Sequence, residues 1–220
     1  MPAVSLNTPS GEIGGWRADP MGKSRGGVVV AHEIYGFNPN IRGLIDRLAA
    51  HGFSAIAPVF FDHFEPGLAL GYDAQDTARG RELAMKVGFE RALEDVAVAA
   101  EALRDRVEHV GVLGFSWGGT VAFLANTRLE MPAVVYYGSR TLPFLHEAPK
   151  AHLMLHFGAH DPLIDAEALQ AHRNALPDAV IRVWNAGHGF NCDDRADYDE
   201  ASAHHAFRHT RRFFRWVLGS

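Results

Sequence analysis

A serine near the middle of the chain lies on a glycine-rich turn between a predicted strand and a predicted helix. The run reads Gly111-Val-Leu-Gly114-Phe-Ser116-Trp-Gly118-Gly119, with an apolar strand over Val110 to Leu113 and a helix over Trp117 to Arg128. A Gly-x-Ser-x-Gly sequence in this setting is typical of a strained turn that lifts the serine hydroxyl above the strand ends. Glycine on both sides removes side chains that would collide where the backbone reverses.

The other strands and helices alternate in lengths typical of a mostly parallel sheet with helices on both faces. We expect an opening β-hairpin over Val4 to Arg17. Further strands are expected over residues 26–31, 54–58, 133–137, 152–157 and 180–184. Helices are expected from Asn38 to Gly52, over 78–106 with a break near Gly88, over 165–175 and at the end of the chain. Residues 60–76 show no clear period. We find no linker or internal repeat, so residues 1–220 are predicted to form a single domain. Together with the serine turn between strand and helix, this pattern favours the α/β-hydrolase fold.

Composition gives no support to several classes of function. The chain has 220 residues, 47% of them hydrophobic, and its formal net charge of −5 gives no basic footprint that would argue for nucleic acid or an anionic membrane as a partner. Cys192 is the only cysteine, which rules out an intrachain disulfide and a thiolate zinc cluster. The first residues lack the pattern of a signal peptide, and no apolar run approaches membrane-spanning length. We therefore expect a cytoplasmic protein.

A serine hydroxyl is a weak nucleophile and needs an adjacent base, which an acid in turn orients. In α/β-hydrolases the chain order is serine, acid, histidine. His188 follows the last predicted strand in Asn185-Ala-Gly-His188-Gly-Phe, and Asp161 follows the preceding strand in Phe157-Gly-Ala-His-Asp161-Pro-Leu. The sequence therefore predicts Ser116 as nucleophile, His188 as base and Asp161 as the orienting acid.

Competing histidines and acids have simpler explanations. His156 lies inside a strand, and His204, His205 and His209 are on the final helix, where they are expected to face solvent. Asp165 begins a helix and is better explained as its N-cap. The acids and histidines at 193, 194, 204 and 205 have no diagnostic metal-ligand spacing, so no metal site is predicted.

These residues and several shorter motifs make the chain resemble the dienelactone hydrolase family over nearly its whole length. The motifs are His32-Glu33-Ile34-Tyr35-Gly36, Ile41-Arg42, Leu48-Ala49, Gly52-Phe53, Ala57-Pro58, Val135-Tyr136-Tyr137-Gly138, Gly158-Ala-His-Asp161 and Ala186-Gly187-His188-Gly189-Phe190. The resemblance implies a compact fold, hydrolysis of lactones and related esters, and no cofactor. It also implies that Glu33 projects beside the nucleophile and that the backbone N–H groups of Ile34 and Trp117 form the oxyanion hole.

The nucleophile is one departure from the family, whose best-known members have cysteine where this chain has Ser116. A thiol is partly ionised near neutrality and a neighbouring glutamate can gate it, whereas a serine hydroxyl cannot be switched in this way. Glu33 is therefore open to other roles, such as binding substrate, holding a water, capping a loop or pairing with Arg42.

The arginines are the second departure. The family places an arginine four residues after the catalytic histidine to bind a substrate carboxylate, and here that position is Cys192. Arg79 and Arg81 are both candidates for the family's other arginine, which precedes the long helix. The loss at position 192 argues against a carboxylate-bearing dienelactone as the substrate.

The short connection over residues 138–151 leaves no room for a cap domain. We expect a shallow cleft walled by Tyr35, Phe37, the 60–72 segment, Trp117 and Phe190, with Phe60 and Phe61 in the core. A small ester or lactone fits such a cleft better than a triglyceride.

Three hypotheses follow for a monomer or small homo-oligomer. The first is a serine hydrolase that cleaves a small ester or lactone through an acyl-enzyme. The second keeps this mechanism for another bond, such as a thioester or a peptide ester. The third is a non-catalytic α/β-hydrolase fold used for ligand binding or protein interaction.

Overall fold

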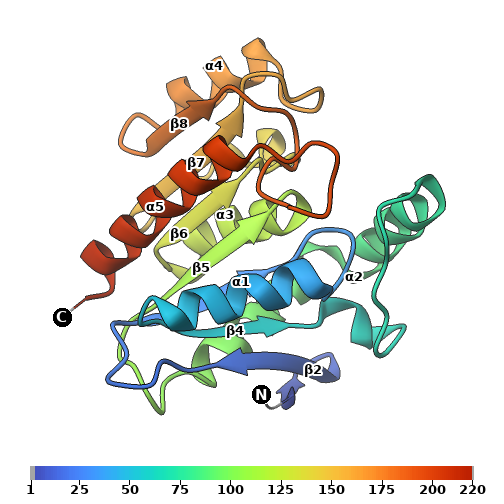
Figure 1. Cartoon of the computed structure of the whole chain (residues 1–220), viewed down its shortest axis with the longest axis vertical. Helices are drawn as coiled ribbons and strands as arrows, with labels where there is room; N and C mark the ends of the chain where they lie inside the picture. Colours follow the sequence, from blue (N-terminus) through green and yellow to red (C-terminus); the bar gives the residue numbers. More distant parts are fainter. Residues whose placement is uncertain (1–2, 220) are drawn as a thin grey trace.

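A single twisted sheet of eight strands forms the centre of the protein (Figure 1). The computed structural model describes residues 3–219. In spatial order the strands are β1 (Ala3–Thr8), β2 (Gly11–Ala18), β4 (Ser54–Pro58), β3 (Gly27–Ala31), β5 (Val110–Phe115), β6 (Ala133–Tyr136), β7 (Leu153–Gly158) and β8 (Val180–Trp184). The β1–β2 hairpin is antiparallel and pairs antiparallel with β4, while β4 to β8 run parallel. This is the α/β-hydrolase architecture that the sequence predicts.

Helices cover both faces of the sheet. They are α1 (Pro39–Ala50), α2 (Ala74–Glu101), α3 (Trp117–Leu129), α4 (Ala166–Ala175) and α5 (Glu200–Val217), with short 3₁₀ helices η1 (Phe60–His63) and η2 (Leu142–Phe144). In Figure 1, α1 and α5 lie in front of the sheet and α3 lies behind it. The inner strands β3 to β7 are buried along their whole length, as expected of strands covered on both faces.

The helix ends follow local chemistry. Asn38 caps α1 by accepting a hydrogen bond from the Ile41 N–H, and Pro39 occupies the first turn, where a missing N–H costs nothing. Asp165 caps α4 in the same way, which confirms its assignment as an N-cap. Asp73 caps α2, so that helix begins four residues before its predicted start and ends five residues before its predicted end.

Helix α2 is broken where the sequence predicts it. Gly88 has φ 69° and ψ 172°, a backbone conformation that is essentially restricted to glycine. The break separates an outer half, which carries Thr77, Arg81 and Met85, from an inner half that packs on the sheet through Leu93 and Val96. The outer half therefore reaches over the edge where the parallel strands end (Figure 1).

Loops of functional interest meet at that edge. Parallel strands present their carboxyl ends on the same side, so the residues after β3, β5, β6, β7 and β8 converge although they are far apart in sequence. The connection from β6 to β7 contains only η2, and no cap domain is inserted there. No helix among residues 3–219 is long and apolar enough to cross a membrane.

Candidate active site

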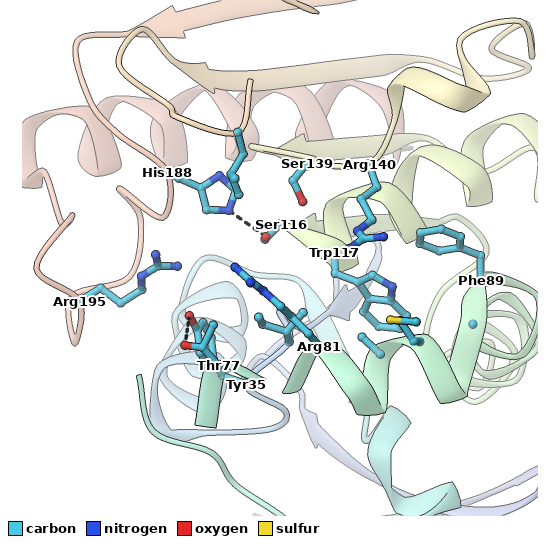
Figure 2. A pocket seen from close by; sticks show the side chains of 15 residues that line it. Tyr35, Thr77, Arg81, Phe89, Ser116, Trp117, Ser139, Arg140, His188 and Arg195 are labelled. Atoms are coloured by element: carbon cyan, nitrogen blue, oxygen red, sulfur yellow. Dashed lines mark hydrogen bonds between the residues drawn. The ribbon is translucent and has the colours of Figure 1, made fainter. Parts of the chain in front are cut away.

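Ser116 sits on a strained turn between β5 and α3. Its backbone has φ 51° and ψ −113°, outside the regions that non-glycine residues favour. A Cβ on Gly114 would lie 1.9 Å from the Gly118 carbonyl oxygen, and a Cβ on Gly118 would lie 2.3 Å from the carbonyl oxygens of Ala31 and His32. The two flanking glycines are therefore required by close backbone approach, and the turn aims the Ser116 side chain into the cavity (Figure 2).

A continuous hydrogen-bonded chain links Ser116, His188 and Asp161. Ser116 Oγ lies 2.8 Å from His188 Nε2, and His188 Nδ1 lies 2.7 Å from Asp161 Oδ2. With the proton on Nδ1, the imidazole donates to the carboxylate and accepts from the serine hydroxyl. All three side chains are largely buried, so few waters compete for these bonds.

The loop after β7 fixes the Asp161 carboxylate. Its Oδ1 accepts a hydrogen bond from the Leu163 N–H at 2.8 Å, which leaves Oδ2 for His188. Asp165 accepts from the Ala168 N–H at the start of α4 instead. Of the two acids weighed from the sequence, the structure therefore places Asp161 against the imidazole.

A cavity of about 760 Å³ opens beside Ser116 and His188 (Figure 2). Its apolar wall comes from α2, the start of α3 and the loop after β7, with Ala84, Met85, Phe89, Trp117 and Leu163. Polar side chains from α2 and from the loops after β3, β6 and β8 complete the lining: Tyr35, Thr77, Arg81, Ser139, Arg140 and Arg195. This volume and mixed lining suit a small organic molecule with a polar group.

The two residues whose backbone N–H groups are expected to form the oxyanion hole lie at the cavity that contains Ser116. Ile34 follows β3, Trp117 is the first residue of α3, and both line the cavity. In the described part of the chain, neither amide takes part in the backbone hydrogen bonds of loops and turns. The α3 N-terminus adds the positive end of its dipole at the same point.

The buried His32 side chain braces the loop that carries Ile34. Its Nδ1 lies 2.6 Å from the Glu33 carbonyl oxygen, and its Nε2 accepts from the Phe60 N–H at 3.2 Å. Burial lowers the pKa of His32 to about 4, so the ring is neutral and can donate at one nitrogen while it accepts at the other. This supporting role is one that the sequence motif alone did not assign.

Glu33 is buried, does not line the cavity and forms an ion pair with Arg195, which does line it. Glu33 Oε1 is 3.8 Å from Arg195 Nη1 and has no hydrogen-bond partner among the described residues. Burial raises the pKa of Glu33, and the charge of the Arg195 guanidinium opposes that shift. The pairing with Arg42 considered from the sequence is wrong, because the Arg42 guanidinium lies over the Trp16 ring, 4.3 Å from its centroid.

Several residues expected at the cleft lie elsewhere. Phe190 is fully buried and packs against the Tyr137 ring, and Phe37 packs against Trp16. The 60–72 segment lines no part of the cavity, and Phe60 and Phe61 are in the core as predicted. Arg79 pairs with Glu65 and Glu82 on the surface, whereas Tyr35 and Arg81 line the cavity.

Sequence reasoning missed two arginines of the cavity, Arg140 and Arg195. Arg195 comes from the long loop after β8, where it passes over Gly189, and a Cβ on Gly189 would lie 2.5 Å from the guanidinium carbon. Arg140 lies two residues after the Tyr136-Tyr137-Gly138 motif. Its place just after a strand of the parallel sheet was the available signal. Although this chain has Cys192 where the family has an arginine, the cavity still contains positively charged side chains.

No group of three or more histidine, cysteine, aspartate or glutamate side chains within residues 3–219 could hold a metal ion.

Comparison with protein families agrees with this geometry. A model described as the dienelactone hydrolase family matches residues 13–218. The chain belongs to this family. A Synechocystis protein named "Putative carboxymethylenebutenolidase" is 27% identical over 98% of this chain and 96% of its own length. The carboxymethylenebutenolidase of Pseudomonas sp. strain P51 is 31% identical over 85% of this chain and 83% of its own length.

Solved structures of the dienelactone hydrolase family share the fold. A Klebsiella pneumoniae structure titled "Putative Dienelactone Hydrolase" superposes with a TM-score of 0.86 at 27% identity and covers 97% of both chains. The promiscuous phosphotriesterase P91, described as dienelactone hydrolase-like, superposes at 0.76 with 20% identity, which shows the shared fold alone. The chain is thus a dienelactone hydrolase-like member of the hydrolases.

Proposed function

We propose that this protein hydrolyses a small ester or lactone through an acyl-enzyme formed on Ser116. The observation that carries the proposal is the hydrogen-bonded chain from Ser116 Oγ through His188 to Asp161, which reaches the cavity at its serine end. A fold used only for binding would have no need of a base 2.8 Å from a serine on a strained turn.

Each residue has a defined task in the proposed reaction. Ser116 Oγ attacks the carbonyl carbon while His188 Nε2 takes the hydroxyl proton, and the N–H groups of Ile34 and Trp117 bind the oxyanion. The imidazolium then gives its proton to the leaving alkoxide, which departs as an alcohol from an ester and stays on the acyl group as a hydroxyl when a lactone ring opens. Water repeats the sequence on the acyl-enzyme, releases the acid and regenerates Ser116. Asp161 stabilises the imidazolium in both halves.

The cavity favours a substrate that carries an anionic group. Arg81 lines it, and the Pseudomonas relative is named for a lactone with a carboxymethylene substituent. A guanidinium binds a carboxylate through two parallel hydrogen bonds. We therefore extend the proposal to carboxylate-bearing esters and lactones, which the loss of arginine at position 192 had argued against.

The first experiment is hydrolysis of a neutral activated aryl ester by the wild-type protein and by Ser116→Ala. We expect the substitution to lower kcat by about 10³-fold or more, because no other group supplies the nucleophile. A serine-directed phosphonate should add one adduct, located at Ser116 by mass spectrometry. The Ser139→Ala variant is the matched control, because it removes another cavity serine and should still take the adduct.

Absence of turnover and of any adduct in the wild-type protein would favour the non-catalytic binding hypothesis. Turnover that survives Ser116→Ala would show that another group performs the reaction. Comparison of an oxygen ester with the corresponding thioester then decides between the two catalytic hypotheses.

A further inference from the structure

The charge inside the cavity is strongly positive in a protein whose formal net charge is −5. Three arginines line the cavity, Arg81, Arg140 and Arg195, and no aspartate or glutamate does. Arg195 is compensated, because it pairs with Glu33 and with Asp197 at 3.1 Å. Within residues 3–219, Arg81 and Arg140 form no ion pair. The cavity thus keeps two uncompensated guanidinium groups.

Arg140 is exposed, yet its backbone is held firmly in place. Its N–H donates to Thr120 Oγ1 at 3.2 Å, and Thr120 is fully buried on α3. The next residue, Thr141, is fixed twice: its hydroxyl donates to the Gly138 carbonyl oxygen at 3.1 Å and lies 2.6 Å from His172 Nε2. A pinned backbone reduces the freedom that an arginine loses when it binds an anion.

Arg140 also occupies its own part of the cavity. Figure 2 shows it beside Trp117 and Phe89, with Ser116 between it and Arg195. Arg81 reaches from α2 toward Ser116 in the same view. The two uncompensated charges therefore come from different elements and approach the nucleophile from different sides. Each arginine can thus bind an anionic group of its own, and the two need not share a single carboxylate.

We propose that Arg140 is a specificity-determining residue that binds a second anionic group of the substrate. The preferred substrate is then a small ester or lactone with two carboxylates, one bound by Arg81 and the other by Arg140, with the scissile carbonyl at Ser116 between them. Stacking of an unsaturated or aromatic portion on Trp117 and Phe89 fits the apolar wall on the Arg140 side. This inference rests on the proposed esterase function and specifies in addition that the substrate carries two negative charges.

The test uses four esters that differ only in charge. The acyl group is hexanoyl or adipoyl, which replaces a terminal methyl by a carboxylate, and the leaving group is 4-nitrophenol or 3-carboxy-4-nitrophenol. The set contains one neutral ester, two monoanions and one dianion. For each, kcat/KM is measured with the wild-type protein and with Arg81→Gln, Arg140→Gln and Arg173→Gln. Arg173 is an exposed arginine of α4 outside the cavity and controls for the change in net charge.

We expect each carboxylate to raise kcat/KM of the wild-type protein by about tenfold, since charge-assisted hydrogen bonds are the strong ones. Arg140→Gln should abolish the gain from one carboxylate, and Arg81→Gln the gain from the other. Arg173→Gln should leave both gains in place. High salt should shrink both gains in the wild-type protein, because the groups are solvent-accessible.

Two results would overturn the inference while leaving the esterase function standing. In one, the dianion is hydrolysed no faster than the better monoanion, although the neutral ester is turned over by Ser116. In the other, both cavity variants lose the gain from the same carboxylate, which would mean that Arg81 and Arg140 bind one group together. Failure of the neutral ester itself would instead count against the proposed function.

Discussion

The role of each histidine in this protein depends on the atoms that surround its ring. His188 meets a hydroxyl at one ring nitrogen and a carboxylate at the other, an arrangement that can gain and release a proton. His156 lies in β7, accepts from Trp184 Nε1 at 3.1 Å and donates to Thr210 Oγ1 at 3.2 Å. Burial lowers the pKa of His156 to about 3, so this imidazole serves as a neutral core group.

At the residue scale, Asp161→Asn should lower kcat by about 10³- to 10⁴-fold with little change in the melting temperature. The reason is that an amide cannot hold the imidazole in the required tautomer or stabilise the imidazolium cation. Asp165→Asn is the matched control. Asparagine caps a helix as well as aspartate does, so this variant should keep both activity and stability. Equal losses of activity in the two variants would contradict the assignment of Asp161.

Helices α1 and α2 each contain a glycine, and the two glycines differ in backbone conformation. Gly43 lies in the regular interior of α1, and Gly88 lies at the break in α2 with φ 69°. A Cβ at either position would meet no atom within 4 Å, so space does not distinguish them. The difference between the two sites is therefore one of backbone conformation alone.

At the element scale, Gly43→Ala should raise the free energy of unfolding by about 0.5–1 kcal/mol, since alanine reduces the freedom of the unfolded chain and favours a helix. Gly88→Ala should lower it by about 1–3 kcal/mol, because alanine strains at positive φ. Urea denaturation of both variants measures this difference. A stabilising Gly88→Ala would mean that α2 can straighten, and the cavity wall formed by Arg81 and Met85 would then move.

The stability of the whole molecule depends on buried groups that must change protonation when it unfolds. His32 and His156 are neutral when folded and titrate near pH 6.5 when unfolded. Below that pH the unfolded chain binds more protons than the folded one, so stability falls as pH falls. Asp95 and Glu33, whose pKa values burial raises, act in the opposite direction; for Asp95 the pKa rises to about 6.

At the molecular scale, we expect each buried histidine to remove about 2 kcal/mol of stability between pH 7 and pH 5, with Asp95 restoring about 1 kcal/mol. Urea denaturation at the two pH values measures the net change, in which Glu33 acts in the same direction as Asp95. The His156→Gln variant keeps a group that can accept from Trp184 and donate to Thr210, yet it cannot titrate. Its pH dependence should be shallower than that of the wild type; an unchanged slope would contradict the role given to His156.

The sequence by itself determined the order of strands and helices, the strained turn at Ser116 and the positions of Asp161 and His188. These features depend on local patterns and on one general rule, that parallel strands bring the residues at their carboxyl ends together. The break in α2 could also be predicted from the local sequence, because only glycine readily adopts the backbone conformation found at residue 88.

Only the tertiary structure decided which side chains reach the cavity. Glu33 faces Arg195 instead of Arg42, Phe190 turns into the core, and Arg140 joins Arg81 at the cavity. These outcomes depend on contacts between segments that are distant along the chain, since a long side chain at a strand or loop end can point in several directions until its neighbours pack against it. Local pattern places a residue at the edge of the sheet, and packing alone selects its partner.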